Sequence, residues 1–272
     1  MKFLIFIALI FVCHFAAAKP DNPIDLSNPD QIHAEYFAHG NSLGTFVFLS
    51  GDGAGAGQGF DENFAAKCVA FQHQGWNVIA VQSKRWLRAL GTTEIANNKC
   101  LDISSELTKT VTPLLPQNQV GCLSLVGFSY GTGIATAAYL ESPKSWCGLV
   151  TLSWCKNLYL QGHKPSQSIC RDASDPSAFS YTPSTGLFTM NRYTGPTKSL
   201  IVQGTLDQVC EYSPTSSYLI NTNGTLVEND RQSLRRISVM GSDHNLTDEN
   251  EGYPWLGDFS RFILELQAER EN

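Results

Sequence analysis

The sequence predicts a single α/β domain built on a doubly wound, mostly parallel sheet. Short apolar segments typical of strands buried on both faces alternate with segments typical of helices. The chain has 272 residues, of which 42% are hydrophobic and 16% charged, as expected for a packed globular core. Right-handed crossovers between such strands give a sheet covered by helices on both faces. Neither an internal repeat nor a linker divides the chain, so we expect one domain.

Each element follows from a local pattern. The apolar segments that predict buried strands are residues 45–50, 76–82, 121–127, 147–154, 198–204 and 235–241. The segments that predict helices are residues 62–75, 93–111, 132–142 and 255–270. The stretch QIHAEYF, residues 31–37, predicts a short edge strand. Residues 155–197 are polar and carry four prolines, and a loop this long is usually functional, so we expect a lid-like insertion.

The first residues have the pattern of a secretory signal peptide. Lys2 precedes an apolar run, residues 3–15, which leads to three alanines at Ala16–Ala18. A membrane anchor is the alternative, but the run is short for a bilayer and contains His14. We therefore expect residues 1–18 to be removed, leaving residues 19–272 as the mature, exported domain.

Charge and cysteine content narrow the function classes. The formal net charge is −6, and Lys and Arg form no long cluster, so no nucleic-acid partner is expected. Neither CxxC nor HExxH occurs, and we predict no metal site.

The chain has eight cysteines, and removal of Cys13 leaves seven in an oxidising compartment. A disulfide among Cys155, Cys170 and Cys210 would attach the insertion to the body. Cys122 and Cys147 each precede a predicted strand and either pair or are small buried apolar residues. The pairing of these seven is left open: Cys68, Cys100, Cys122, Cys147, Cys155, Cys170 and Cys210.

A nucleophile is predicted by LVGFSYGTG, residues 125–133. Ser129 lies between Gly127 and Gly131, after an apolar strand and before an alanine-rich helix. This is the setting of a nucleophile elbow, in which small residues permit a strained turn and close helix–strand packing. The predicted fold is therefore of the α/β-hydrolase type, with Ser129 as nucleophile.

A serine nucleophile needs a base and an acid, which follow it in the order Ser, acid, His in this fold. His244 lies just after the last predicted strand and is the only histidine after the candidate acid, Asp207. Asp207 follows the strand that ends at Gly204 and would orient the imidazole. The alternative acids are Asp243 and Asp248, and the alternative histidines are His73 on a predicted helix and His163 in the insertion.

Two backbone amides should bind the developing oxyanion. One is that of Tyr130, directly after the nucleophile, and the other should come from the glycine-rich loop Gly51-Asp52-Gly53-Ala54. The alternative for this loop is phosphate binding, but no GK[ST] follows it. A carboxylate opposes an oxyanion, so Asp52 either points away or contacts a cationic part of the substrate.

Five motifs resemble the VirJ/AcvB group of exported bacterial virulence-associated α/β-hydrolases. They are LSGDG (49–53), VQSKRW (81–86), the LVGFSYG elbow, GTLDQVC (204–210) and GSDHN (241–245), spread over residues 45–266. The resemblance implies a periplasmic Gram-negative enzyme and, for some members, removal of lysyl groups from phosphatidylglycerol. It departs at Ala54-Gly55 and Thr132-Gly133, where the group has other residues. Substrate contacts are predicted for Asp52, Arg85 and Trp86.

We therefore expect a serine ester hydrolase that acts through an acyl-enzyme and needs no cofactor. Its substrate is an ester or an aminoacyl lipid, with peripheral contact to a membrane. The alternatives are a thioesterase or peptidase with the same triad, and a non-catalytic periplasmic binding or secretion-accessory protein on a hydrolase fold. The acyl group and the oligomeric state do not follow from the sequence.

Overall fold

The computed structural model describes the central sheet, its helices and parts of the insertion. The described residues are 34–37, 39, 42–51, 62–87, 103–115, 122–142, 144–154, 157–159, 179–182, 187–190, 198–210 and 234–271. The predicted signal peptide lies outside them.

The core of the described structure is a seven-stranded sheet in the order β1-β3-β2-β4-β5-β9-β10. Its strands are β1 (Ala34–Phe37), β2 (Gly44–Leu49), β3 (Trp76–Val81), β4 (Ser124–Phe128), β5 (Leu149–Leu152), β9 (Ser199–Gly204) and β10 (Leu234–Val239). Only β1, at one edge, pairs antiparallel within this sheet, while the other six strands are parallel. The predicted doubly wound, mostly parallel sheet is thus confirmed.

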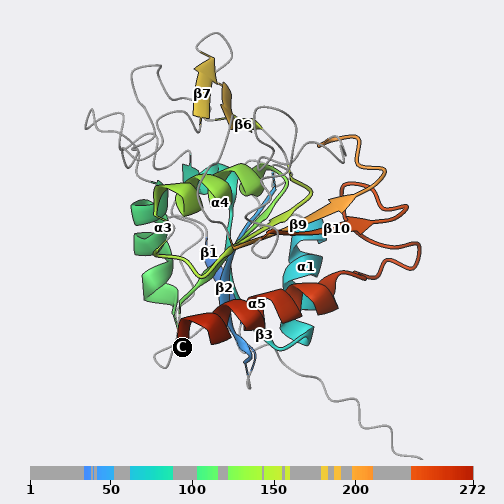
Figure 1. Cartoon of the computed structure of the whole chain (residues 1–272), viewed down its shortest axis with the longest axis horizontal. Coiled ribbons are helices and arrows are strands. Elements are labelled where there is room, and N and C mark those ends of the chain that lie inside the picture. The colour runs from blue at the N-terminus through green and yellow to red at the C-terminus, as the bar shows by residue number, and fades with distance from the viewer. Residues whose placement is uncertain are drawn as a thin grey trace, which may run out of the picture.

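Helices cover both faces of the sheet. Helices α3 (Ile103–Val111) and α4 (Tyr130–Glu141) lie on one face, and α1 (Glu62–His73) and α5 (Leu256–Glu271) lie on the other (Figure 1). A short 3₁₀ turn, η1 (Thr112–Leu114), continues α3. Crossover helices on both sides are what parallel strands of this length require.

Strand β2 shows why its sequence is apolar throughout. Val47 and Leu49 belong to the hydrophobic cluster under α3 and α4. Phe46 and Phe48 belong to the cluster on the opposite face, under α1 and α5. Because successive side chains of a strand point to opposite faces, a strand covered on both sides needs apolar residues at every position.

The last helix is held by aromatic contacts. The ring centroid of Phe71, on α1, lies 4.5 Å from that of Phe259, on α5, and 4.9 Å from that of Phe46. Trp255 adds a ring contact at 5.7 Å from Phe71. This cluster fixes α5 against the sheet, and with it the chain that returns from β10.

The described strands and helices lie close to the predicted segments, with two differences. Helix α3 is described from Ile103, and the earlier part of the predicted helix lies outside the described residues. The insertion contains three strands that its polar composition did not indicate: β6 (Asn157–Tyr159), β7 (Phe179–Thr182) and β8 (Leu187–Met190). They form an antiparallel sheet in the order β6-β8-β7, with β6 next to α4 (Figure 1).

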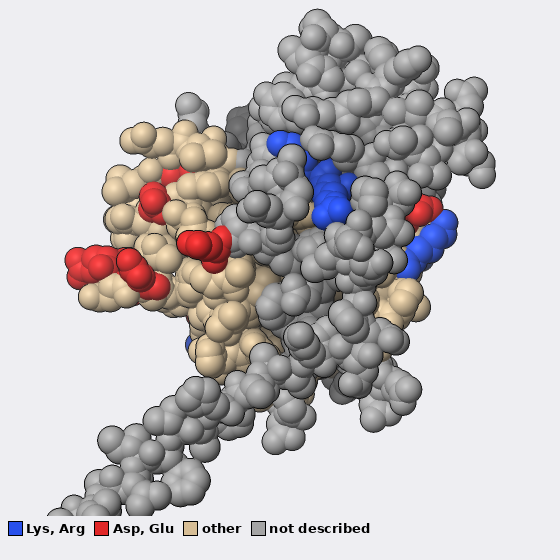
Figure 2. Space-filling model, turned by 180° about the vertical axis from the view of Figure 1, so that it is seen from behind, with Lys and Arg blue, Asp and Glu red and all other residues tan. Residues whose placement is uncertain are grey.

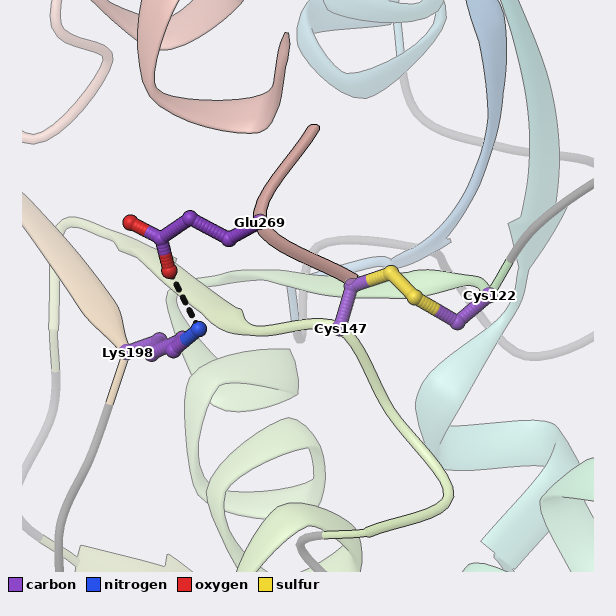
Figure 3. Close-up of a disulfide and its surroundings, with 4 residues drawn as sticks. All are labelled: Cys122, Cys147, Lys198 and Glu269. Atoms are coloured by element: carbon purple, nitrogen blue, oxygen red, sulfur yellow. Dashed lines mark hydrogen bonds and ion pairs between the residues drawn. A yellow bond between two sulfur atoms is a disulfide. The ribbon is translucent and has the colours of Figure 1, made fainter. Parts of the chain in front are cut away.

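One disulfide ties the starts of two neighbouring strands. Cys122, before β4, is bonded to Cys147, before β5, with their Cα atoms 5.4 Å apart (Figure 3). An ion pair between Lys198 and Glu269 lies nearby and joins the start of β9 to α5. Both contacts lie at the amino ends of the parallel strands.

The other described cysteines differ in state. Cys68 on α1 is buried and forms no disulfide. Cys210, after β9, is disulfide-bonded to a partner outside the described residues. A bond from Cys210 to the insertion therefore stays a prediction.

The charge of the described surface is uneven. Figure 2 shows acidic side chains gathered on the side of the molecule where the loop after β10 lies, at the left of that view. This loop, residues 240–255, carries Asp243, Asp248, Glu249 and Glu251. None of the helices within the described ranges has the length and apolar character needed to cross a bilayer.

Candidate active site

The site lies where the parallel strands end. Leu49 of β2 is in register with Gly127 of β4, and Phe128 is in register with Leu152 of β5. At the other side of the sheet, Gly204 of β9 is in register with Val239 of β10. The loops that leave these strands therefore start side by side, which is where open α/β sheets bind ligands.

Ser129 occupies a strained turn between β4 and α4. Its backbone has φ 51° and ψ −119°, a conformation that L-residues rarely adopt, and it precedes the first residue of α4. A Cβ at Gly127 would lie 2.6 Å from the Thr132 Cα, and one at Gly131 would lie 2.3 Å from the Leu49 carbonyl oxygen. Both glycines are therefore needed for the close approach that the elbow pattern predicted.

Three predicted side chains meet at this edge of the sheet. The His244 Nε2 lies 2.8 Å from the Ser129 Oγ, and the His244 Nδ1 lies 3.0 and 2.9 Å from the two carboxylate oxygens of Asp207. The His244 side chain is 17% exposed, and that of Asp207 is fully buried. The carboxylate accepts a hydrogen bond from Nδ1–H, which leaves Nε2 as an acceptor for the Ser129 hydroxyl.

Backbone amides and one side chain hold the Asp207 carboxylate. The amides of Val209 and Cys210 both donate to Oδ1 at 2.9 Å, and Gln203 Nε2 donates to Oδ2 at 2.8 Å. Burial alone would raise the pKa of Asp207. The His244 hydrogen bond, the two amides and the attraction of a charged imidazole outweigh that effect and hold the pKa of Asp207 below its ordinary value. Asp207 therefore stays ionised opposite the imidazole.

The loop that carries His244 is anchored on two sides. The Ser153 hydroxyl donates to the His244 carbonyl oxygen at 2.5 Å, and the Trp255 indole donates to the Leu246 carbonyl oxygen at 2.8 Å. Leu246 is fully buried despite a φ of 63°. The imidazole also lies against the Phe128 ring, with centroids 5.4 Å apart. These contacts fix the ring in front of Ser129.

The alternative acids serve local turns instead. The Asp243 Oδ1 accepts the amide of Asn245, and the Asp248 Oδ1 accepts the amides of Asn250 and Gly252. Each is an aspartate that closes its own loop. Of the alternative histidines, His73 is exposed at the end of α1, and His163 lies outside the described residues.

Part of the predicted oxyanion site is described. Tyr130 is the first residue of α4, and the first amides of a helix point out of its N-terminus. Gly51 lies beside the nucleophile, since a Cβ built on it would be 3.2 Å from the Ser129 Cβ. Asp52, Gly53 and Ala54 lie outside the described residues.

The two other predicted substrate contacts have different settings. Trp86 is fully buried in the core under α3, and its indole donates to the Thr110 hydroxyl at 2.9 Å. It packs as a core residue, which differs from the substrate contact predicted for it, because its large apolar ring is stabilised by burial. Arg85 lies one residue earlier and is partly exposed.

Two residues of the site were missed by the sequence analysis. Gln203 supports the Asp207 carboxylate, and Ser153 supports the His244 backbone. A signal for Gln203 was present, because it is a polar residue inside the buried strand LIVQG. Buried polar groups need partners, so its position predicts a hydrogen-bonding role. Ser153 gave no comparable signal.

Comparison with known proteins gives matches to solved structures alone. No family model matches the chain, and no curated protein matches it. The structure of TT1662 from Thermus thermophilus is similar with a TM-score of 0.50 and 13% identity, covering 88% of this chain and 94% of that chain. Esterase PE8 gives a TM-score of 0.49 at 14% identity, covering 87% of this chain and 99% of that one. The esterase domain of a Rhodothermus marinus protein gives 0.49 at 12% identity, covering 86% and 92%.

At sequence identities this low, structural similarity is evidence about the fold alone. The match to TT1662 extends over nearly all of both chains, and six parallel strands with helices on both faces carry the elbow after β4. The residues Asp207 and His244 follow β9 and β10, in the order that this architecture uses. The fold is therefore that of the α/β-hydrolases.

Proposed function

We propose that this chain is a serine hydrolase that cleaves an ester bond through a Ser129–His244–Asp207 triad. The observation that carries the proposal is the pair of contacts made by one imidazole. Its Nε2 lies 2.8 Å from the Ser129 Oγ while its Nδ1 meets the buried Asp207 carboxylate. A serine hydroxyl becomes a nucleophile when such a base accepts its proton.

In this mechanism the Ser129 Oγ attacks the ester carbonyl as His244 Nε2 takes its proton. The resulting oxyanion is bound by the amide of Tyr130 and by amides of the loop that begins at Gly51. The imidazolium, stabilised by Asp207, then protonates the departing alcohol and leaves an acyl-enzyme. Water attacks the acyl-enzyme with His244 again as base, which releases the acid and restores Ser129.

The test is covalent labelling with a fluorophosphonate probe, with the modified peptide located by mass spectrometry. We expect labelling of the peptide that contains Ser129, and its loss in Ser129→Ala and His244→Ala. Ser142→Ala is the matched control, because this serine lies at the opposite end of α4 and bonds to Ser145. The control should be labelled as strongly as the parent.

Steady-state turnover measures how much Ser129 contributes to the rate and which type of bond the protein cleaves. Ser129→Ala should lower kcat on a reactive ester by on the order of 10⁶-fold. Matched oxyester, thioester and amide substrates distinguish an esterase from a thioesterase or a peptidase. A folded parent protein that is neither labelled nor active would contradict the proposal and favour the non-catalytic binding protein.

For the substrate we propose an aminoacyl ester of phosphatidylglycerol, with lysyl as the acyl group. The support is the resemblance carried by the SGDG and SKRW motifs, together with the acidic residues of the loop that carries His244. Negative charge near a site attracts a cationic substrate. The measurement compares lysyl- and alanyl-phosphatidylglycerol hydrolysis by the parent and by Asp52→Asn. A lysyl preference that is the same in both proteins would refute the proposed role of Asp52.

We also propose that the mature protein is exported to the periplasm. The support is the pattern of Lys2, the apolar run and Ala16–Ala18. Expression with the native leader, followed by fractionation and N-terminal sequencing, should give a periplasmic protein that begins at Lys19. Retention of Lys2 in the isolated protein would contradict this.

A further inference from the structure

The acid and the base belong to a closed ring of hydrogen bonds that also includes Gln203, Trp154 and Ser153. Gln203 Nε2 donates to Asp207 Oδ2 at 2.8 Å, and its Oε1 accepts the amide of Trp154 at 2.8 Å. The residue before Trp154 is Ser153, whose hydroxyl donates to the His244 carbonyl oxygen at 2.5 Å. The His244 ring returns to Asp207 through Nδ1. The ring thus joins the ends of β5, β9 and β10.

The Gln203 amide is fixed in one orientation. Its side chain is buried, with the residue 4% exposed, and its Nε2 has two acceptors, Asp207 Oδ2 and the Cys210 carbonyl oxygen at 2.9 Å. Its Oε1 faces the Trp154 amide, which only donates. A flipped amide would place oxygen against oxygen and N–H against N–H, so the two ends cannot exchange.

Ser153 holds a strained backbone conformation. Its φ is 51°, like that of Ser129 on the neighbouring strand end, and the residue is fully buried. Its amide donates to the Val202 carbonyl oxygen at 2.9 Å, so the strand pairing continues through it. A non-glycine residue in this conformation persists where surrounding contacts require it, and such residues cluster at functional sites.

We propose that Gln203 and Ser153 are positioning residues of the triad. Gln203 orients the Asp207 carboxylate toward His244 Nδ1, and Ser153 holds the His244 backbone at the distance that sets Nε2 against Ser129. This inference rests on the proposed function for its kinetic consequences. The geometry itself makes a second prediction, on the ionisation of His244, that needs no turnover.

The charged and titratable groups around His244 are few within the described structure. Asp207, from the loop after β9, is in direct contact, and Asp243 precedes His244 in its own exposed loop. From α1, the Lys67 ammonium lies 4.3 Å from the centroid of the Phe128 ring that packs on the imidazole. Gln203 itself is neutral, so a charged residue at this position adds one charge to the three groups named above.

The experiment is an NMR titration of ¹³C-histidine-labelled full-length mature protein in the parent, Gln203→Glu and Gln203→Met. Glu keeps the size of the side chain but replaces the Nε2 donor with a carboxyl group beside Asp207, and two buried carboxyl groups this close share one proton until the pH is high enough to ionise both. Once both are ionised, the added negative charge favours the imidazolium and raises the midpoint of the His244 titration. Gln203→Met adds no charge and should leave the midpoint within a few tenths of a unit.

Gln203→Met has its own spectroscopic prediction. With the Oδ2 donor removed, the carboxylate is held less firmly, and the low-field proton resonance of the His244 Nδ1–H should broaden or shift upfield. A parental low-field resonance in folded Gln203→Met would overturn the assignment of Gln203. If that variant does not fold, a His244 titration curve in Gln203→Glu that coincides with the parental curve over the whole pH range overturns it equally.

Ser153 is tested by Ser153→Ala and Ser153→Gly. Both remove the hydroxyl, but glycine also relieves the positive φ, so the pair separates the hydrogen bond from the strain. We expect each to lower kcat about tenfold with little change in KM, because the His244 ring loses its alignment and the substrate pocket does not. A parental kcat in either folded variant would overturn this role.

The two proposals fail in different ways. A parent protein that does not label at Ser129 refutes the hydrolase function, and the NMR measurements still decide whether Gln203 orients the Asp207 carboxylate toward His244. An active parent whose low-field His244 resonance is unchanged in Gln203→Met refutes the positioning role of Gln203 alone.

Discussion

At the scale of single residues, the chemistry depends on a carboxylate that is buried and yet ionised. Asp207 has a fully buried side chain that accepts three N–H donors besides the His244 ring, from Gln203, Val209 and Cys210. Asp207→Asn keeps the size of the side chain but cannot stabilise an imidazolium. We expect kcat on an ester substrate to fall by about 10⁴-fold, measured by steady-state turnover.

The matched control is Asp248→Asn. Asp248 lies in the same acidic loop region as His244, but its Oδ1 accepts the amides of Asn250 and Gly252, which an asparagine also does. Its kcat should equal that of the parent. Equal losses in both variants would show that general loop charge, and not the Asp207–His244 contact, controls the rate.

The pKa of Asp207 also predicts how stability depends on pH. Since its pKa is lower in the folded than in the unfolded protein, Asp207 stabilises the fold fully above the ordinary aspartate value of about 3.9. This contribution is lost as the pH falls through the folded-state pKa. In urea unfolding, the free-energy gap between the parent and Asp207→Asn should therefore narrow below about pH 4. A gap that is constant from pH 6 to pH 3 would contradict this.

At the scale of elements, the elbow depends on how closely α4 approaches β2. A Cβ at Gly131 would lie 2.3 Å from the Leu49 carbonyl oxygen and 2.6 Å from that of Ser50. Because both are backbone atoms, Gly131→Ala must push the helix away. We expect a loss of about 1–3 kcal/mol in the free energy of unfolding, measured in urea, and a large loss of kcat.

Gly257→Ala provides the control for this substitution. Gly257 lies in the first turn of α5, and a Cβ there would meet nothing within 4 Å. Stability should be unchanged or slightly raised, since alanine favours a helix over glycine. Similar destabilisation by both substitutions would contradict a cost that comes from the helix–strand contact, because a Cβ at Gly257 meets no neighbouring atom.

Elements with strong local patterns were predictable from the sequence. The apolar runs at β2, β3 and β9 predict strands buried on both faces, and GFSYG predicts the turn that separates β4 from α4. The chain order of Ser129, Asp207 and His244 is enough to suggest that they meet, because parallel strands bring their ends together.

Other features depend on distant partners and leave little trace in the sequence. Trp86 follows a strand in a motif that suggested substrate contact, but the space under α3, formed by residues far along the chain, accepts its ring. The strands β6 and β8 pair with each other across a polar insertion, and their alternation is too short to detect. Ser153 acquires its role from the His244 backbone, 91 residues away.

At the scale of the whole molecule, stabilisation and chemistry lie at opposite ends of the strands. The Cys122–Cys147 disulfide joins the amino ends of β4 and β5, whereas Ser129 follows the carboxyl end of β4. The bond spans a sequence separation of 25 residues, and closing a loop of this length stabilises by about 3.5 kcal/mol in the chain-entropy model. Cys122→Ser with Cys147→Ser should lower the free energy of unfolding by about that amount and leave kcat near the parental value.

Cys68→Ala is the comparison for this pair. Cys68 is buried and forms no disulfide, so its substitution removes buried volume without opening a covalent loop. When Cys122→Ser and Cys147→Ser are introduced into Cys68→Ala, the free energy of unfolding should fall by the same amount as when they are introduced into the parent. A large fall of kcat in the double serine variant at temperatures where it is folded would contradict the separation of the two ends.

The position of β10 has a consequence for how the molecule would be switched off. In the described sheet β10 is an edge strand that pairs with β9 alone, and the loop that follows it carries His244. Fraying of this strand pair, together with loss of the Ser153 and Trp255 hydrogen bonds to the following loop, withdraws the base, while the elbow at Ser129 in the middle of the sheet keeps its shape. Inactivation by mild heat should therefore precede global melting and reverse on cooling. Between the two temperatures the protein would populate an inactive state in which the nucleophile is ordered but lacks its base.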